Sequence, residues 1–173
     1  MSKAFFALIK EKKIVIPTVC VLLVLAALSF VPIRWSISQT VTARVIENMS
    51  VASAVETELT IDGEYSFYLF RPDRFKGSIE MAAFPETAGK CVELETAEAW
   101  PDHLVYRSWN GAKLNSESFG LIQTDFGMKR MIIFKSDADG IINLSGEQTC
   151  VILVGDVMLS DAYRLLCDLN NIK

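Results

Sequence analysis

Histidine is almost absent from this sequence, and the cysteines show no pairing motif. His103 is the only histidine, and none of the four cysteines stands in a Cys-x-x-Cys spacing. A zinc site built from several histidines is therefore excluded, and any catalytic histidine must be His103. No Gly-x-Ser-x-Gly nucleophile motif occurs either. Without any catalytic, cofactor or metal signature above background, we expect no catalytic residue, no bound cofactor and no metal.

Charge is missing from one long stretch, Ile14 to Ile33. Twenty helical residues rising about 1.5 Å each would cover the ~30 Å hydrocarbon layer of a bilayer. Thirteen of the twenty are Val, Ile, Leu or Phe, and only Thr18, Cys20 and Ser29 are polar. A buried helix of a soluble protein would carry more polar residues on some face. The stretch therefore predicts one transmembrane helix over residues 14–33.

The flanking charges predict the orientation of this helix. Four lysines and one glutamate lie within residues 1–13, whereas Arg34 is the first basic residue behind the run. Basic flanks tend to stay in the cytosol, and Trp35 suits the outer interface. We expect a short cytoplasmic N-terminus (1–13), a signal anchor in the cell membrane, and a single-pass protein with its C-terminal domain outside.

A cleaved signal peptide is the main alternative, because it also combines a basic start with an apolar region. Ala27 and Ser29 are small enough for a weak cleavage site. The apolar run continues past them through Phe30, Val31 and Ile33, which favours an uncleaved anchor. Cleavage would instead release a secreted β domain.

The part behind the anchor is acidic. Residues 35–173 hold twelve basic and twenty acidic side chains, a formal charge of −8. This charge argues against nucleic acid as a partner and against adsorption to an anionic lipid surface.

The first segment of that part, residues 34–53, is predicted to be a membrane-proximal strand or stalk. Ile37, Val41, Ala43 and Val45 alternate with polar residues, as in a half-buried strand. Three of them are also four residues apart, so a helical stalk stays open.

Residues 54–173 are predicted to form one β-rich domain. The clearest alternation runs from Val55 to Leu69 around Asp62-Gly63. We predict a hairpin there with a three-residue loop, which sets Ile61 opposite Tyr65 and Leu59 opposite Phe67. A two-residue turn would move one apolar face into water.

Further strands are expected at 79–83, 92–94, 104–109, 119–123, 131–134, 141–144 and 150–154. The last is apolar throughout, as in a strand buried on both faces. Ser160 or Asp161 can cap a C-terminal helix with Tyr163, Leu166, Cys167 and Leu169 on its buried side. The fold class is a transmembrane helix plus an all-β or α+β domain, an antiparallel sheet or sandwich with a C-terminal helix.

Two groups of polar residues could carry chemistry. Glu93, Glu95, Glu98 and Asp102 lie within ten residues, and His103 follows with Ser108 nearby. A catalytic site would require these side chains to converge, and acidic runs are usually a solvated surface. An extracytoplasmic enzyme with a site assembled from dispersed acidic residues is therefore the alternative hypothesis and not the favoured one.

Cys150 and Cys167 are the pair we would test for a disulfide, because one lies on the apolar strand and the other on the helix.

Aromatic residues are dense between Tyr65 and Phe75. Tyr65 and Phe67 are expected to point inward, so Tyr68 and Phe70 fall on the other face beside Arg71 and Arg74. These four form a candidate partner surface, although the second buried face of a sandwich strand is the favoured explanation of the aromatic residues. The sequence favours a non-enzymatic, membrane-anchored module that binds a protein partner or small ligand in the envelope.

Overall fold

The computed structural model describes residues 17–21, 23, 26, 31–96, 101–137 and 149–170. Residues 17–21, 23 and 26 are helical and belong to the predicted membrane segment. The other residues of that segment up to 30, the predicted cytoplasmic residues 1–13 and the predicted strand 141–144 lie outside the described residues. Within the described ranges, no helix has the length and apolar character needed to cross a membrane.

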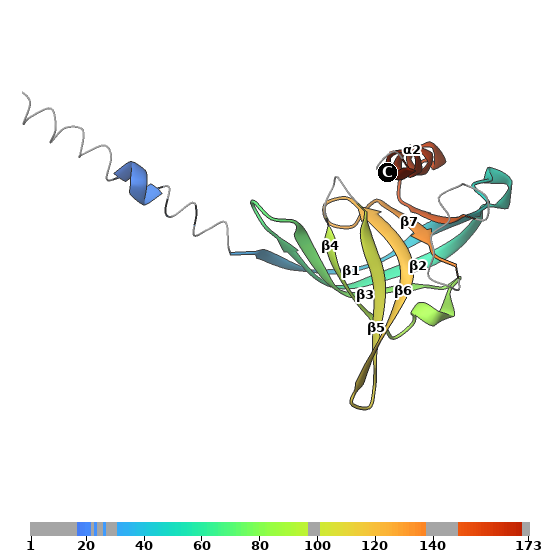
Figure 1. Ribbon diagram of the computed structural model, residues 1–173, viewed down its shortest axis with the longest axis horizontal. Helices are drawn as coiled ribbons and strands as arrows, with labels where there is room; N and C mark the ends of the chain where they lie inside the picture. Colours follow the sequence, from blue (N-terminus) through green and yellow to red (C-terminus); the bar gives the residue numbers. More distant parts are fainter. Residues whose placement is uncertain are drawn as a thin grey trace, which may run out of the picture.

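Eight antiparallel strands in the described residues form a closed barrel (Figure 1). Each strand pairs with its neighbours in sequence, and β1 pairs with β8 to close the sheet. The strands are β1 (Ile33–Glu47), β2 (Val55–Phe67), β3 (Asp73–Met81), β4 (Cys91–Thr96), β5 (Asp102–Asn110), β6 (Lys113–Thr124), β7 (Met131–Lys135) and β8 (Cys150–Val154). The domain also has, in its described residues, two short 3-10 helices, η1 (Val51–Ser53) and η2 (Pro85–Thr87), and the C-terminal helix α2 (Leu159–Asn170). The predicted β-rich domain with a C-terminal helix is confirmed, and its antiparallel sheet closes into a barrel.

The alternating strand directions give the barrel two distinct ends. All odd-numbered strands begin at one end, which we call the proximal end because the chain joins the barrel there at Ile33. The β2–β3 and β6–β7 turns lie at the same end. The β1–β2 connection, η2 and the β5–β6 turn lie at the opposite, distal end. The segment 34–53 is therefore mostly a barrel strand, β1, and the helical stalk is not formed.

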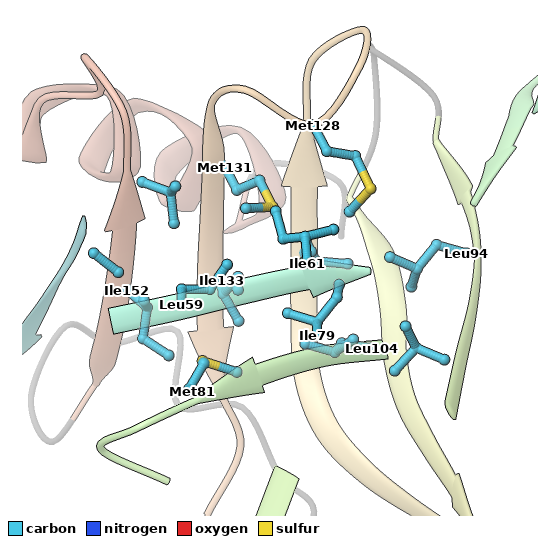
Figure 2. Close-up of a cluster of buried hydrophobic side chains, with 14 of the residues drawn as sticks. Leu59, Ile61, Ile79, Met81, Leu94, Leu104, Met128, Met131, Ile133 and Ile152 are labelled. Atoms are coloured by element: carbon cyan, nitrogen blue, oxygen red, sulfur yellow. The ribbon is translucent and has the colours of Figure 1, made fainter. Parts of the chain in front are cut away.

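The barrel interior is filled with apolar side chains (Figure 2). Eight strands enclose a space just wide enough for side chains to fill. The labelled residues of Figure 2 come from most of the strands and point toward one another: Leu59, Ile61, Ile79, Met81, Leu94, Leu104, Met128, Met131, Ile133 and Ile152. All ten belong to one buried cluster.

A second core lies outside the barrel, where α2 covers β7 and β8. Val151 and Leu153 of β8 face the helix, whereas Ile152 and Val154 face the interior. This two-sided burial confirms the prediction for residues 150–154. The helix buries Ala162, Leu165 and Leu166, together with part of Leu169.

The prediction of which residues this helix buries is half wrong. Tyr163 and Cys167 are exposed, so the buried stripe is rotated by about one residue from the expected one. Asp161 accepts a hydrogen bond from the Met158 N–H at 2.9 Å and so caps the first turn.

The predicted hairpin within Val55–Leu69 is also wrong, because β2 runs without a turn through Asp62-Gly63. Ile61 lies opposite Gln39 and Ile79, and Leu59 lies opposite Val41 and Met81. The alternation keeps the same phase on both sides of Gly63, so a straight strand buries the same residues as the expected hairpin. The inward placement of Tyr65 and Phe67 is confirmed.

Where the turn was expected, the structure has a close contact between two glycines on the inner face of β2 and β3. Gly63 pairs with Gly77 of β3, and the ring of Phe75 lies against both. A Cβ added at Gly77 would stand 2.1 Å from the Asp62 carbonyl oxygen and 2.6 Å from the Gly63 Cα. Neither neighbour is a flexible side chain, so the two strands require glycine here.

We expect Gly77→Ala to destabilise the barrel by roughly 1–3 kcal/mol, because the added methyl group overpacks a rigid contact. Denaturant unfolding of the full chain in detergent measures this. Lys76→Ala, on the exposed face of the same strand, should change stability by less than about 0.5 kcal/mol. Equal unfolding midpoints for the two variants would contradict the glycine contact.

Candidate functional site

The acidic residues chosen from the sequence are engaged in surface ion pairs. Arg107 Nη1 lies 3.1 Å from Glu93 Oε2, and Arg74 Nη2 lies 2.5 Å from Glu95 Oε1. These carboxylates project from the outer face of β4, whereas Val92 and Leu94 fill the interior. Glu98 lies outside the described residues.

Asp102 and His103 are not arranged with Ser108 as a catalytic group. The Asp102 carboxylate accepts hydrogen bonds from the backbone N–H groups of Glu95 and His103, both at 2.7 Å. His103 is exposed, and Ser108 lies five residues farther along the same strand, about 16 Å away at 3.3 Å per residue. The described residues hold no cluster of three side chains able to bind a metal ion.

Cys150 and Cys167 do not form the expected disulfide. All four cysteines are free thiols. Cys150 packs against the barrel interior, whereas Cys167 is exposed on the helix that covers the opposite face of β8. A bond between them would have to pass through the strand. Burial raises the pKa of the Cys150 thiol, although the nearby Lys135 ammonium opposes this shift.

The candidate partner surface lies at the proximal end, in and beside the β2–β3 turn. Phe70 is 73% exposed and Arg71 is exposed, whereas Tyr68 is half-buried. Arg74 belongs to β3 and is held by Glu95. The structure therefore brings Phe70 and Arg71 to a projecting tip and leaves the other two at its base.

Hydrogen bonds fix this turn. The Asp73 carboxylate accepts one from the Tyr65 hydroxyl at 2.8 Å and one from the Tyr68 N–H at 2.9 Å. Bonds to a carboxylate are stronger than bonds between neutral groups, so the turn has a defined shape.

An aromatic cluster closes the barrel below the turn. Phe126, from the β6–β7 turn, packs against Trp35, Tyr65 and Phe67 with ring centroids 5.3–5.7 Å apart. Trp35 and Tyr65 lie 4.9 Å apart. Offset and edge-on contacts of this kind favour aromatic pairs, so the proximal end is sealed by rings.

The distal end carries a projecting hairpin that the sequence analysis missed. Among the described strands, residues 108–110 of β5 and 113–115 of β6 pair only with each other. They extend beyond the barrel as a two-stranded ribbon (Figure 1). Trp109 and Leu114 face each other across it and are 73% and 44% exposed. The sequence feature that could have predicted this hairpin is the dipeptide Asn110-Gly111 between two strands. Gly111 has a positive φ, which suits a two-residue hairpin loop.

A polar hollow of about 250 Å³ lies at the distal end beside this ribbon. It is lined in part by Glu86, Tyr106, Phe119 and Lys135. The Lys135 ammonium stands 5.0 Å from the Phe84 ring centroid and 3.9 Å from Glu86. Burial, assisted by Glu80 and Glu86, raises the pKa of the Tyr106 phenol, which donates to the Ile79 carbonyl at 2.6 Å. Tyr106 therefore stays neutral and serves the fold.

Comparison with protein-family models, curated proteins and solved structures finds no match for this chain. Its function must therefore be argued from its own residues. In the part of the chain that the structure describes, the β2–β3 turn and the β5–β6 ribbon are projecting apolar features at opposite ends of the barrel.

We expect alkylation to show two independent thiols at positions 150 and 167. In denaturant without reductant, each should take one label. In the folded protein, Cys167 should react faster than Cys150, because Cys150 is half-buried and its raised pKa leaves less thiolate at a given pH.

The Cys150 rate should still be increasing above the ordinary thiol pKa of about 8.5. Mass spectrometry of labelled peptides measures both rates, with exposed Cys91 as the control. Loss of both labels until reductant is added would establish the disulfide instead.

Proposed function

We propose that this protein is a membrane-tethered, non-enzymatic binding module, anchored by residues 14–33 with its barrel outside the cytosol. Its distal ribbon, built around Trp109 and Leu114, binds a protein partner in the envelope. The observation that carries the proposal is the contrast between a barrel interior filled with side chains and an exposed Trp-Leu pair on a projecting ribbon.

The filled interior supports binding on the outside of the barrel. Small-molecule sites are usually concave cavities of ~300–1,000 Å³ that enclose most of the ligand. The barrel axis holds packed side chains instead, including the rings of Phe75 and Tyr106, which are almost fully buried. Of the acidic residues considered as acids or bases, the three that the structure describes are bound to arginines or backbone N–H groups: Glu93, Glu95 and Asp102.

The ribbon has the features of a protein contact. Tryptophan is among the residues that contribute most to binding energy, because its large ring loses much apolar surface to a partner. Trp109 stands on a two-stranded ribbon with Leu114 directly opposite, so the strand pairing already places the two apolar residues side by side before binding. Asn110, Lys113 and Asn115 around the pair supply the polar rim of an ordinary interface.

The two ends of the barrel also support this division of roles. The uncharged run joins the barrel at the proximal end, and the ribbon projects from the distal end. A tether at one end leaves the other accessible to proteins in the envelope.

We expect a photo-crosslinking amino acid at position 113, the exposed lysine beside the Trp109–Leu114 pair, to give an adduct of one defined mass in the full chain in native membranes. Leu114→Ser should reduce its yield about tenfold or more, because hot-spot truncation costs roughly 2 kcal/mol or more. Position 58, an exposed glutamate on the wall of β2, is the control and should give no adduct. Equal yields at both positions, or a yield unaffected by Leu114→Ser, would contradict the proposal.

A further inference from the structure

We propose that the β2–β3 turn inserts into the outer interface of the membrane, beside the point where the chain leaves the bilayer. The barrel then rests directly on the lipid surface through Leu69 and Phe70. This inference depends on the membrane anchor of the proposed function and assigns the candidate surface around Phe70 to lipid instead of a protein.

Exposed apolar side chains gather at the proximal end. Val31 and Ile33, at the end of the uncharged run, are each 62% exposed. Leu69 and Phe70 in the turn are 54% and 73% exposed. Soluble surfaces tolerate single exposed apolar residues, but a group of them marks a site of contact with a protein or a membrane.

Strand register places the turn level with the end of the uncharged run. Ile33 pairs with Phe67 at the last position of β2. The chain continues for five residues, 68–72, before β3 begins at Asp73. Leu69 and Phe70 therefore extend beyond Ile33, toward the side from which the uncharged run arrives. Figure 1 shows the end of the β2–β3 hairpin beside the start of β1.

No linker separates the uncharged run from the barrel. The run ends at Ile33, which is also the first residue of β1, and Arg34 is the first charged residue. A helix that ends at the outer interface would therefore hold the proximal end against the headgroups. A protein bound to the turn would have to occupy the headgroup layer, so lipid is the favoured occupant.

Hydrogen bonds hold the base of the turn that carries these apolar side chains. Asp73 holds the turn through Tyr65 and Tyr68, and the aromatic cluster supports it from below. Phe70 consequently projects outward and stays separate from the core. Aromatic side chains are enriched at the headgroup level of membrane proteins, where an apolar ring beside polar groups is stable.

Insertion should depend on apolar contact more than on charge. Arg34 lies 3.6 Å from Glu64, and Arg74 is paired with Glu95, so the rim beside the turn carries balanced charges. The acidic character of residues 35–173 opposes attraction to anionic lipids. Zwitterionic lipid is therefore sufficient for the test.

The test uses the full chain in phosphatidylcholine nanodiscs, with trifluoromethyl-phenylalanine at position 70 and, in a second sample, at position 109. The two native side chains have the same exposed fraction, 73%, at opposite ends of the barrel. With a paramagnetic headgroup lipid present, we expect the fluorine signal of position 70 to be lost and that of position 109 to remain. Leu69→Ser should restore part of the signal at position 70.

The other outcomes separate the two proposals. A chain that stays soluble and does not enter the discs overturns the membrane anchor of the proposed function. A chain that enters the discs with equal signals at positions 70 and 109 overturns the lipid contact and leaves the anchor standing. A position-70 signal that survives in lipid, together with a protein crosslink from that position in native membranes, assigns the turn to a protein and also overturns the inference.

Discussion

The close contact between Gly63 and Gly77 is the constraint on which the rest of the barrel depends. Side chains at these positions would hold β2 and β3 apart, and the Phe75 ring could not lie against both backbones. Because the strands approach there, β2 continues for thirteen residues and places Leu59, Ile61 and Tyr65 on one inner face. The same strand carries the chain back to the proximal end, where its turn lies beside Ile33.

The filled interior has a direct consequence for function. A barrel that buries Phe75, Tyr65 and Tyr106 along its axis offers binding surface mainly on its outside. Among the described residues, two hairpins that project from the barrel lie at opposite ends: the β2–β3 turn next to the uncharged run, and the β5–β6 ribbon at the distal end. In the proposed arrangement, one end of the barrel contacts the membrane and the other binds a partner.

Local patterns predicted much of the fold. Alternation identified β1, and the uninterrupted apolar run at 150–154 identified a strand with two buried faces. Asp62-Gly63 was misread because the same dipeptide serves a hairpin turn and a close approach of two strands. Only the pairing of Gly63 with Gly77, fourteen residues away, decides between them. The closure of β1 on β8 is likewise a long-range contact that no local pattern contains.

The candidate sites were less predictable than the fold. Glu93 and Glu95 are close in sequence, but their roles depend on Arg107 and Arg74 from neighbouring strands. Cys150 and Cys167 were chosen as a possible disulfide pair, but Cys150 packs against the barrel interior whereas the helix that carries Cys167 covers the opposite face of β8. Trp109 was passed over as the end of a strand, since its exposure depends on how far the ribbon extends beyond the barrel.

The most direct test of the account is protease protection of a C-terminal tag, on intact cells and on sealed inside-out vesicles, after membrane and soluble fractions have been separated. We expect a full-length, membrane-bound protein whose tag is cleaved only from outside the cell. A shortened soluble product would show that the uncharged run is removed. A tag cleaved only from the cytosolic side would contradict the orientation and, with it, both roles assigned to the ends of the barrel.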